Sequence, residues 1–227
     1  MPASGVGAVL VGTSVLAGAL LATPAPAATK AKPVCRLVSD ARGDAAWLDR
    51  VPGGATDDLL SADLASDGRT VTAVFRMADV QQPDPVAPLG HAYAFYFRVR
   101  GAPDATQHFV SAYTHPTGTR FVYGHLVQDT TGPRAHVLGA AKGTVSVTKD
   151  EVRVHAPAAG FRPPQVRRGA TLTDLHVSVY RWWGVGVMED PFVLGVTVPV
   201  TGTGSGFDEG EGNRYVVGTP SCVKPGT

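Results

Sequence analysis

Aromatic residues are the first candidates for chemistry in this sequence, because several fall at or beyond the ends of predicted strands. The main candidates are Trp47, Tyr180, Trp182 and Trp183. A flat aromatic face on a concave sheet or loop platform can hold a sugar ring. Trp182 and Trp183 are adjacent at a strand end, so they point to opposite faces and at most one lies in the core. Tyr96, Tyr113 and Tyr123 are further candidates. The alternative is that these aromatics fill a core or cap its ends.

Carboxylates form a second group of candidates. Asp40 and Asp44 share the turn SDARGD, and Asp57 and Asp58 follow a glycine-rich segment. Calcium requires six to eight oxygen ligands, so this group is the beginning of a possible calcium site. The alternative is that aspartates in turns bond to the local backbone. A second acidic group, at residues 189–190 and 208–211, lies among glycines, which favours a solvated charge run in a loop.

Local motifs for catalysis are absent from the sequence. The 7 histidines are dispersed, and none has the spacing of a zinc finger or of H-E-x-x-H. The sequence also lacks G-x-S-x-G, C-x-x-C, the P-loop and the dinucleotide fingerprint. Two carboxylates of a glycosidase could still come together from distant strands. The sequence therefore favours a non-enzyme but leaves a hydrolase as an alternative.

A predicted hairpin at residues 57–80 is the main element that would position these groups. Apolar and polar residues alternate on both sides of the turn Ser66-Asp67-Gly68-Arg69, which is typical of a β-hairpin. Strands are also predicted at 35–39, 91–100, 107–114, 119–127, 134–138, 143–148, 151–155, 171–183 and 214–218. Residues 184–212 are predicted to be a loop with one weak strand at most. No amphipathic helix pattern is present, so the sequence predicts an all-β fold, an antiparallel, jelly-roll-like β-sandwich.

Composition excludes some classes of partner. The chain has 227 residues, with 20 basic and 19 acidic side chains. This balance argues against a nucleic-acid partner, which would favour a strongly basic face. The sequence has no isoleucine and a single asparagine, and arginine greatly outnumbers lysine. This bias indicates a GC-rich genome, such as that of an actinobacterium.

Residues 1–28 are predicted to be a secretory signal peptide. They carry no charged side chain, contain an apolar run and end with small residues in an A-x-A pattern. The alternative is an uncleaved anchor, but the run is rich in Gly and Ala and short for a membrane span. Residues 29–34 would be a linker, and residues 35–223 a single β-sandwich domain. Cys35 and Cys222 bracket that domain, and an even pair in an exported protein indicates a disulfide, with two free thiols as the alternative.

The layout of the predicted strands resembles a known group of modules. The chain carries SDARGDA, then D-x-L-x-x-A-x-L-x-S-D-G-x-x-V-x-x-x-F, and later GATLTDLHVSV before an acidic segment and RYVVG. This order is similar to family 9 carbohydrate-binding modules and DOMON-like domains of secreted bacterial enzymes. The resemblance implies a jelly-roll-like sandwich, with calcium in some members and sugar binding in others. It matches calcium to Asp40 and Asp44, with Asp57 or Asp58 as additions, although Ala41 and Arg42 depart from the usual D-P-x-G-D.

The expected function is that of a secreted, non-catalytic binding module for an extracellular carbohydrate or cell-wall glycan. The alternatives are a small glycan-directed hydrolase and a structural or protein-interaction module of the cell surface. Calcium is the only cofactor considered. A monomer is expected, with no nucleic-acid partner and no membrane contact after signal cleavage.

Overall fold

The computed structural model describes residues 33–45, 54–85, 90–102, 106–115, 118–129, 132–161, 166–181, 197–199, 207–212 and 214–226. Residues 31–227 form one compact unit. The predicted signal peptide lies outside the described residues. Within those residues, no helix is long and apolar enough to cross a membrane.

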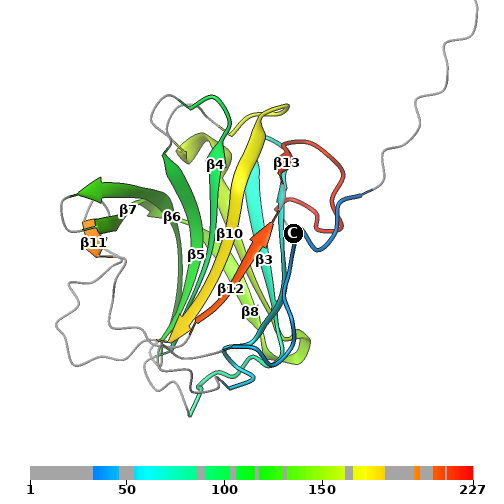
Figure 1. Cartoon of the computed structure of the whole chain (residues 1–227), viewed down its shortest axis with the longest axis vertical. Helices are drawn as coiled ribbons and strands as arrows, with labels where there is room; N and C mark the ends of the chain where they lie inside the picture. Colours follow the sequence, from blue (N-terminus) through cyan, green and yellow to red (C-terminus); the bar gives the residue numbers. More distant parts are fainter. Residues whose placement is uncertain are drawn as a thin grey trace, which may run out of the picture. The chain divides into compact units, whose positions relative to one another are not determined.

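Two antiparallel sheets pack face to face, which confirms the predicted β-sandwich (Figure 1). In spatial order, the first sheet consists of β11 (Thr197–Pro199), β7 (Gly132–Ala140), β6 (Gly118–Asp129), β5 (Gln107–His115), β4 (His91–Val99), β10 (Thr171–Arg181) and β12 (Phe207–Gly212). The second consists of β1 (Val38–Ser39), β2 (Leu59–Ser66), β3 (Thr70–Met77), β9 (Glu151–Pro157) and β8 (Lys142–Ser146). The short β13 (Tyr215–Val216) pairs with β10, and β12 joins β1, so hydrogen bonding continues between the sheets. Two 3-10 turns, η1 (Val147–Lys149) and η2 (Ala158–Gly160), flank β9.

The core lies between the sheets, where alternate residues of each strand point inward. On β4 the inward residues are Tyr93, Phe95, Phe97 and Val99, all buried. The ring of Phe95 lies edge-on to that of Phe75 on β3, with centroids 6.4 Å apart. The other residues of β4 face outward, where Ala92, Ala94 and Tyr96 belong to a separate cluster. Strand β4 therefore separates two apolar regions.

The predicted hairpin is confirmed as β2 and β3. At its turn, the Asp67 carboxylate accepts the backbone N–H groups of Arg69 and Thr70, both at 2.8 Å. Gly68 has φ +87°, a conformation that glycine adopts without strain. One detail differs from the predicted alternation. A register shift between Leu59 and Ser61 brings Leu59 into the core and leaves Leu60 only half-buried.

The prediction of a loop at 208–211 is wrong, because this acidic, glycine-rich segment lies in strand β12 (Phe207–Gly212). Six residues of β12 pair with β10, from Phe207 opposite Tyr180 to Gly212 opposite Leu175. A Cβ at Gly212 would lie 2.8 Å from the carbonyl oxygen of Leu37, so glycine permits the close approach of β1. Strand β1 is shorter than predicted, spanning Val38–Ser39 rather than 35–39. Backbone pairing between neighbouring strands thus overrides the local composition.

The predicted disulfide between Cys35 and Cys222 is confirmed, with Cα atoms 5.1 Å apart. Backbone bonds beside it also join the two ends of the domain. The N–H of Val34 donates to the carbonyl of Pro220 at 2.9 Å, and the N–H of Cys222 donates to the carbonyl of Val34 at 3.0 Å. The start and end of the domain therefore lie side by side.

Candidate functional site

The outer face of β10, β4 and β5 brings three of the predicted tyrosines together. Strand register arranges this face in three rows. The first row is His176, Tyr96 and Phe109; the second is Ser178, Ala94 and Ser111; the third is Tyr180, Ala92 and Tyr113. Successive rows are about 7 Å apart, because every second residue of a strand points to the same face. A row of small side chains therefore lies between two rows that carry the aromatic rings. We call these nine residues the tyrosine face.

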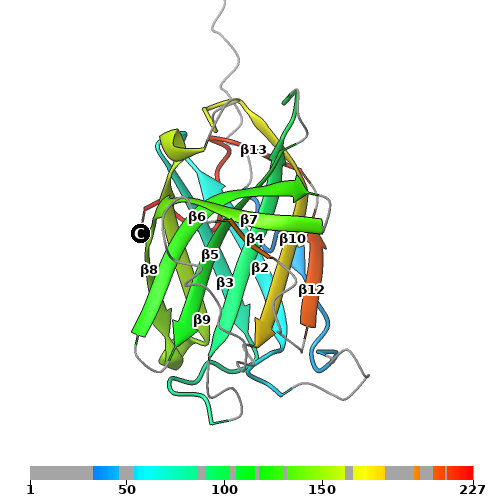
Figure 2. The same cartoon turned by 90° about the vertical axis from the view of Figure 1, so that its left-hand side faces the viewer.

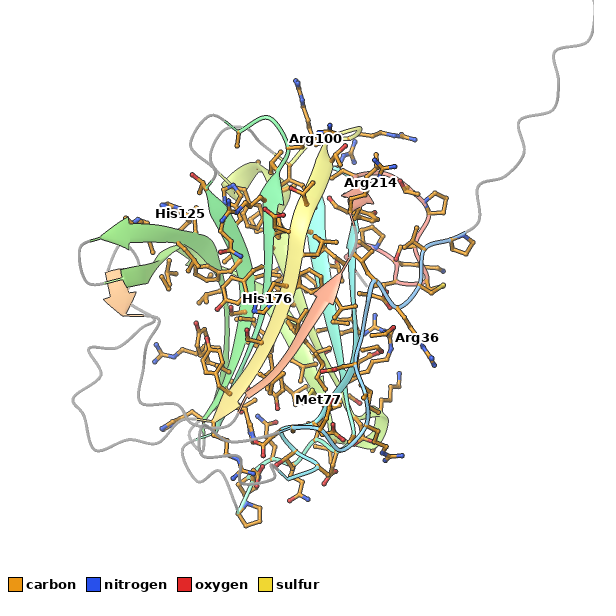
Figure 3. The ribbon with its side chains drawn as sticks, in the orientation of Figure 1. Arg36, Met77, Arg100, His125, His176 and Arg214 are labelled. Atoms are coloured by element: carbon orange, nitrogen blue, oxygen red, sulfur yellow. A yellow bond between two sulfur atoms is a disulfide. The ribbon has the colours of Figure 1, made fainter. Side chains whose placement is uncertain are left out.

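Exposure varies across the tyrosine face. The small residues of the middle row are buried, with Ala94 at 1% and Ser178 at 6%. Tyr96 and Tyr113 are each 7% exposed. Tyr180 and His176, both on β10, keep partial exposure. Figure 3 shows His176 at mid-length of β10. Access from solvent is therefore greatest along β10.

The hydroxyls of Tyr113 and Tyr180 on this face are neutral at physiological pH. Burial raises the pKa of Tyr113, and the neighbouring Tyr180 raises it further. Burial also raises the pKa of Tyr180. The nearby Tyr96, which is hydrogen-bonded to Tyr180, raises it further. The hydroxyl of Tyr113 also bonds with Ser111. Each hydroxyl keeps its proton, so it can both donate and accept hydrogen bonds.

Strands β6 and β7 shelter the tyrosine face. Together they form a ribbon that crosses in front of β4 and β10 (Figure 2) and projects from the body in Figure 1. Leu126 and Ala135 of this ribbon pack against the outer cluster. A register shift at Tyr123 and Gly124 accompanies the change in direction. A Cβ at Gly124 would lie 2.1 Å from the carbonyl oxygen of His136 and 2.7 Å from the ring of Phe109, so only glycine fits there.

A serine and a histidine also meet on this face. The hydroxyl oxygen of Ser178 and Nε2 of His176 are 3.0 Å apart. The ring of His176 lies over that of Tyr96, with centroids 5.8 Å apart. In the register of β10 with β12, Glu211 is opposite His176 and Glu209 is opposite Ser178. This pair could not be predicted from the sequence, because a histidine and a serine separated by one residue match no catalytic motif.

A row of histidines runs along the inner face of β5, β6 and β7. His108 pairs with His125, and His125 pairs with His136 in the next strand. The ring centroids are 6.4 Å and 5.1 Å apart, respectively. His108 is buried against the rings of Phe97 and Phe161. No three His, Cys, Asp or Glu side chains of the described residues have the geometry to hold a metal ion.

The four aspartates proposed for calcium are engaged in different ways. Asp57 is buried and binds Arg181 through both of its oxygens, with further bonds from His91 and the Gly54 N–H. Asp58 is also buried, and both of its oxygens accept the N–H of Gly43 at 2.9 Å. The Asp40 carboxylate accepts the N–H of Ala41 at 3.0 Å, and Asp44 is exposed. Asp57 and Asp58 therefore form hydrogen bonds within the folded structure. Calcium binding by Asp40, Asp44, Asp57 and Asp58 stays a prediction.

The remaining sequence candidates have different outcomes. Trp47, Trp182 and Trp183 lie outside the described residues. Tyr123 is on the inner face of β6, where its ring packs against Phe161 with centroids 5.2 Å apart.

Comparison with models of known protein families, with curated proteins and with solved structures found no match. The resemblance to carbohydrate-binding and DOMON-like domains therefore stays a prediction.

Proposed function

We propose that this chain is a secreted, non-catalytic module that binds an extracellular carbohydrate or cell-wall glycan at the tyrosine face. One observation carries the proposal: neutral tyrosine hydroxyls flank a row of small side chains on a sheltered sheet face. Tyr96 and Tyr180 lie on either side of these small residues, and Tyr180 keeps partial exposure. Protein sites for small ligands combine apolar walls with a few well-placed polar groups, and this face has both.

The polarity of the face suits a hydroxyl-rich, uncharged ligand. Ser111, Ser178 and the three tyrosines carry hydroxyl groups that donate and accept, as sugar hydroxyls do. None of the nine residues of the tyrosine face is Asp, Glu, Lys or Arg. Secretion is supported by the signal-peptide pattern at residues 1–28 and by the disulfide, since disulfides persist in oxidising compartments.

Removing the Tyr180 hydroxyl is expected to weaken glycan binding. We expect Tyr180→Phe to raise Kd about 2- to 10-fold, because one net hydrogen bond is worth roughly 0.5–1.5 kcal/mol. Tyr180→Ala should raise Kd further, because the aromatic contact is also lost. Isothermal titration against a panel of neutral and acidic oligosaccharides, with a pull-down on insoluble cell-wall glycan, would measure this.

Tyr123→Phe provides the matched control for that titration. It removes the same hydroxyl from a tyrosine on the inner face of β6, so it should leave Kd unchanged. Circular dichroism would verify that all variants remain folded. Absence of binding to any glycan, or equal Kd values for wild type and Tyr180→Ala, would contradict the proposal and favour a structural or protein-interaction role.

A hydrolase is the second candidate, favoured by the contact between Ser178 and His176. An activated serine needs a base within hydrogen-bond reach, and 3.0 Å meets that condition. Catalysis would also need donors for an oxyanion. Ser178 lies in the middle of β10, which pairs with β4 on one side and β12 on the other. The backbone N–H groups around Ser178 therefore donate hydrogen bonds within the sheet and do not point at a site for an oxyanion. Labelling by a fluorophosphonate that is lost in Ser178→Ala would establish the hydrolase, and absence of labelling would support the binding role.

A further inference from the structure

Exposed arginines gather at one end of the sandwich, away from the tyrosine face. They come from four segments: the turn between β2 and β3, the end of β4, the segment before β10 and the residue before β13. These arginines are Arg69, Arg100, Arg167, Arg168 and Arg214, and all five side chains are exposed. Figure 3 shows Arg100 and Arg214 at the same end of the molecule. We call these five residues the arginine end.

Backbone contacts hold the four segments of the arginine end together. A Cβ at Gly68 would lie 2.9 Å from the backbone nitrogen of Arg168, so these two segments touch. The side chain of Arg168 also contacts Gly218, just after β13. The N–H of Arg100 donates to the carbonyl of Thr171 at 2.9 Å, which connects the end of β4 to the start of β10. The arrangement is fixed by the fold.

The described carboxylates near this end, those of Asp67 and Asp174, bond to other groups. None of the five forms a salt bridge with any described residue. Asp67 bonds to the backbone of its own turn, and these bonds from Thr70 and Arg69, with a smaller effect of the Arg69 charge, lower its pKa. Asp174 lies 3.4 Å from Arg98. The whole chain has a formal net charge of only +1, so the arginine end is a local concentration of positive charge.

We propose that the arginine end binds a linear phosphodiester polymer of the cell envelope. A guanidinium group presents a planar fork of donors that matches the oxygens of a phosphate. The five side chains extend from separate segments, which suits successive charges along a polymer better than one small anion. Positive surfaces attract polyanions through release of counterions, without requiring a pocket.

The same end is poorly suited to a membrane. A protein that inserts into a lipid surface needs apolar side chains beside its basic ones. Among the described residues, the exposed large hydrophobic side chains are Val127, Val147 and Val216, and only Val216 lies next to these arginines. None of the five residues of the arginine end is aromatic, so none of them provides a ring for stacking on a nucleic-acid base.

The test compares two triple variants of equal charge. One replaces Arg100, Arg167 and Arg214 by serine; the control replaces Arg42, Arg120 and Lys149, which are exposed away from the arginine end. Binding to poly(glycerol phosphate) would be measured between 50 and 300 mM salt (about 14 to 6 Å of screening length). We expect the first variant to lose about 10- to 100-fold in affinity at the lowest salt. Its slope of log affinity against log salt should fall by about 2, since each lost contact removes roughly 0.7. The control should bind like the wild type.

Three results would overturn the proposal: no binding to poly(glycerol phosphate), equal losses in both triple variants, or tighter binding to other anions. The other anions are double-stranded DNA and vesicles of phosphatidylglycerol in phosphatidylcholine. Tyr180→Ala should bind poly(glycerol phosphate) normally, because the two surfaces are separate. Failure of sugar binding at the tyrosine face would thus leave this proposal standing, and the reverse also holds.

Discussion

Replacing Asp57 by asparagine is expected to destabilise the fold by about 3–5 kcal/mol, because it leaves a buried arginine without its carboxylate. The Asp57 side chain is fully buried, and that of Arg181 is 5% exposed. Nε of Arg181 lies 2.6 Å from one carboxylate oxygen, and Nη2 binds the other. Nε2 of His91 lies 3.2 Å from the same carboxylate. Denaturant unfolding at pH 7 would measure the loss as a lower midpoint.

Asp44→Asn provides the control for this measurement. Asp44 is an exposed carboxylate, so its replacement should change stability by less than about 0.5 kcal/mol. A midpoint for Asp57→Asn that equals the midpoint for Asp44→Asn would contradict the expected role of the buried pair.

The contribution of Asp57 should also depend on pH. Burial by itself would raise the pKa of Asp57, but hydrogen bonds from His91, Arg181 and the Gly54 N–H outweigh burial and lower it. The folded pKa is then below the unfolded value of about 4, so the stabilisation is complete above that value and is lost as pH falls through the folded pKa. The difference in unfolding free energy between wild type and Asp57→Asn should therefore shrink below about pH 4. The lowered pKa of Asp67 affects both proteins equally and cancels. A difference that stays constant down to pH 3 would contradict this account.

The role of Asp57 could not be predicted from the sequence. Its partner Arg181 is 124 residues away, and only the packing of β10 beside β4 brings it near. In the sequence, Asp57 beside Asp58 suggests a shared ligand. In the structure, the two carboxylates accept hydrogen bonds from different groups: Asp57 from Arg181, and Asp58 from the N–H of Gly43. A pattern of charges predicts which groups are present, whereas tertiary contacts determine their partners.

The strands show which local signals suffice. The strand predicted at 91–100 is confirmed as β4, where aromatic and small residues alternate with the side-chain period of two that is typical of a strand. The sequence of β12, FDEGEG, has the composition of a loop but forms a strand. Its backbone groups find partners on β10, and glycine permits the close approach of β1. Propensity could not predict that strand, since the pairing that stabilises it comes from residues distant in sequence.

The tyrosine face was predictable only in part. Residue type alone identified Tyr96, Tyr113 and Tyr180 as candidates. The register that sets Ala94 between Ser178 and Ser111 depends on which strands are neighbours and on the bulge after Thr173. The same limit applies to the histidines, since His108, His125 and His136 form a row only through two strand pairings. Pairing of non-consecutive strands such as β4 and β10 is fixed by the whole sandwich, and no local motif encodes it.

Removing the disulfide is expected to cause the other large loss of stability. The bond joins residues separated by 187 positions. Closing a loop of that length restricts the unfolded chain by about 5 kcal/mol in the chain-entropy model. Strand β1 has only two residues, so few backbone pairs hold the first strand in place without the bond. The double variant Cys35→Ser/Cys222→Ser should therefore unfold at a clearly lower denaturant concentration than the oxidised wild type.

Reduced wild type is the matched control for that double variant, because it also lacks the bond but keeps both sulfur atoms. The two should have similar midpoints if the effect comes from the unfolded chain rather than from contacts of the side chains. The backbone bonds between Val34 and Pro220 and between Cys222 and Val34 are expected to survive in both, so the native sheet signal in circular dichroism should be unchanged. A double variant that unfolds at the same midpoint as oxidised wild type would mean that these backbone bonds alone hold the ends together. The domain would then depend on its core and on the buried pair of Asp57 and Arg181 for its stability.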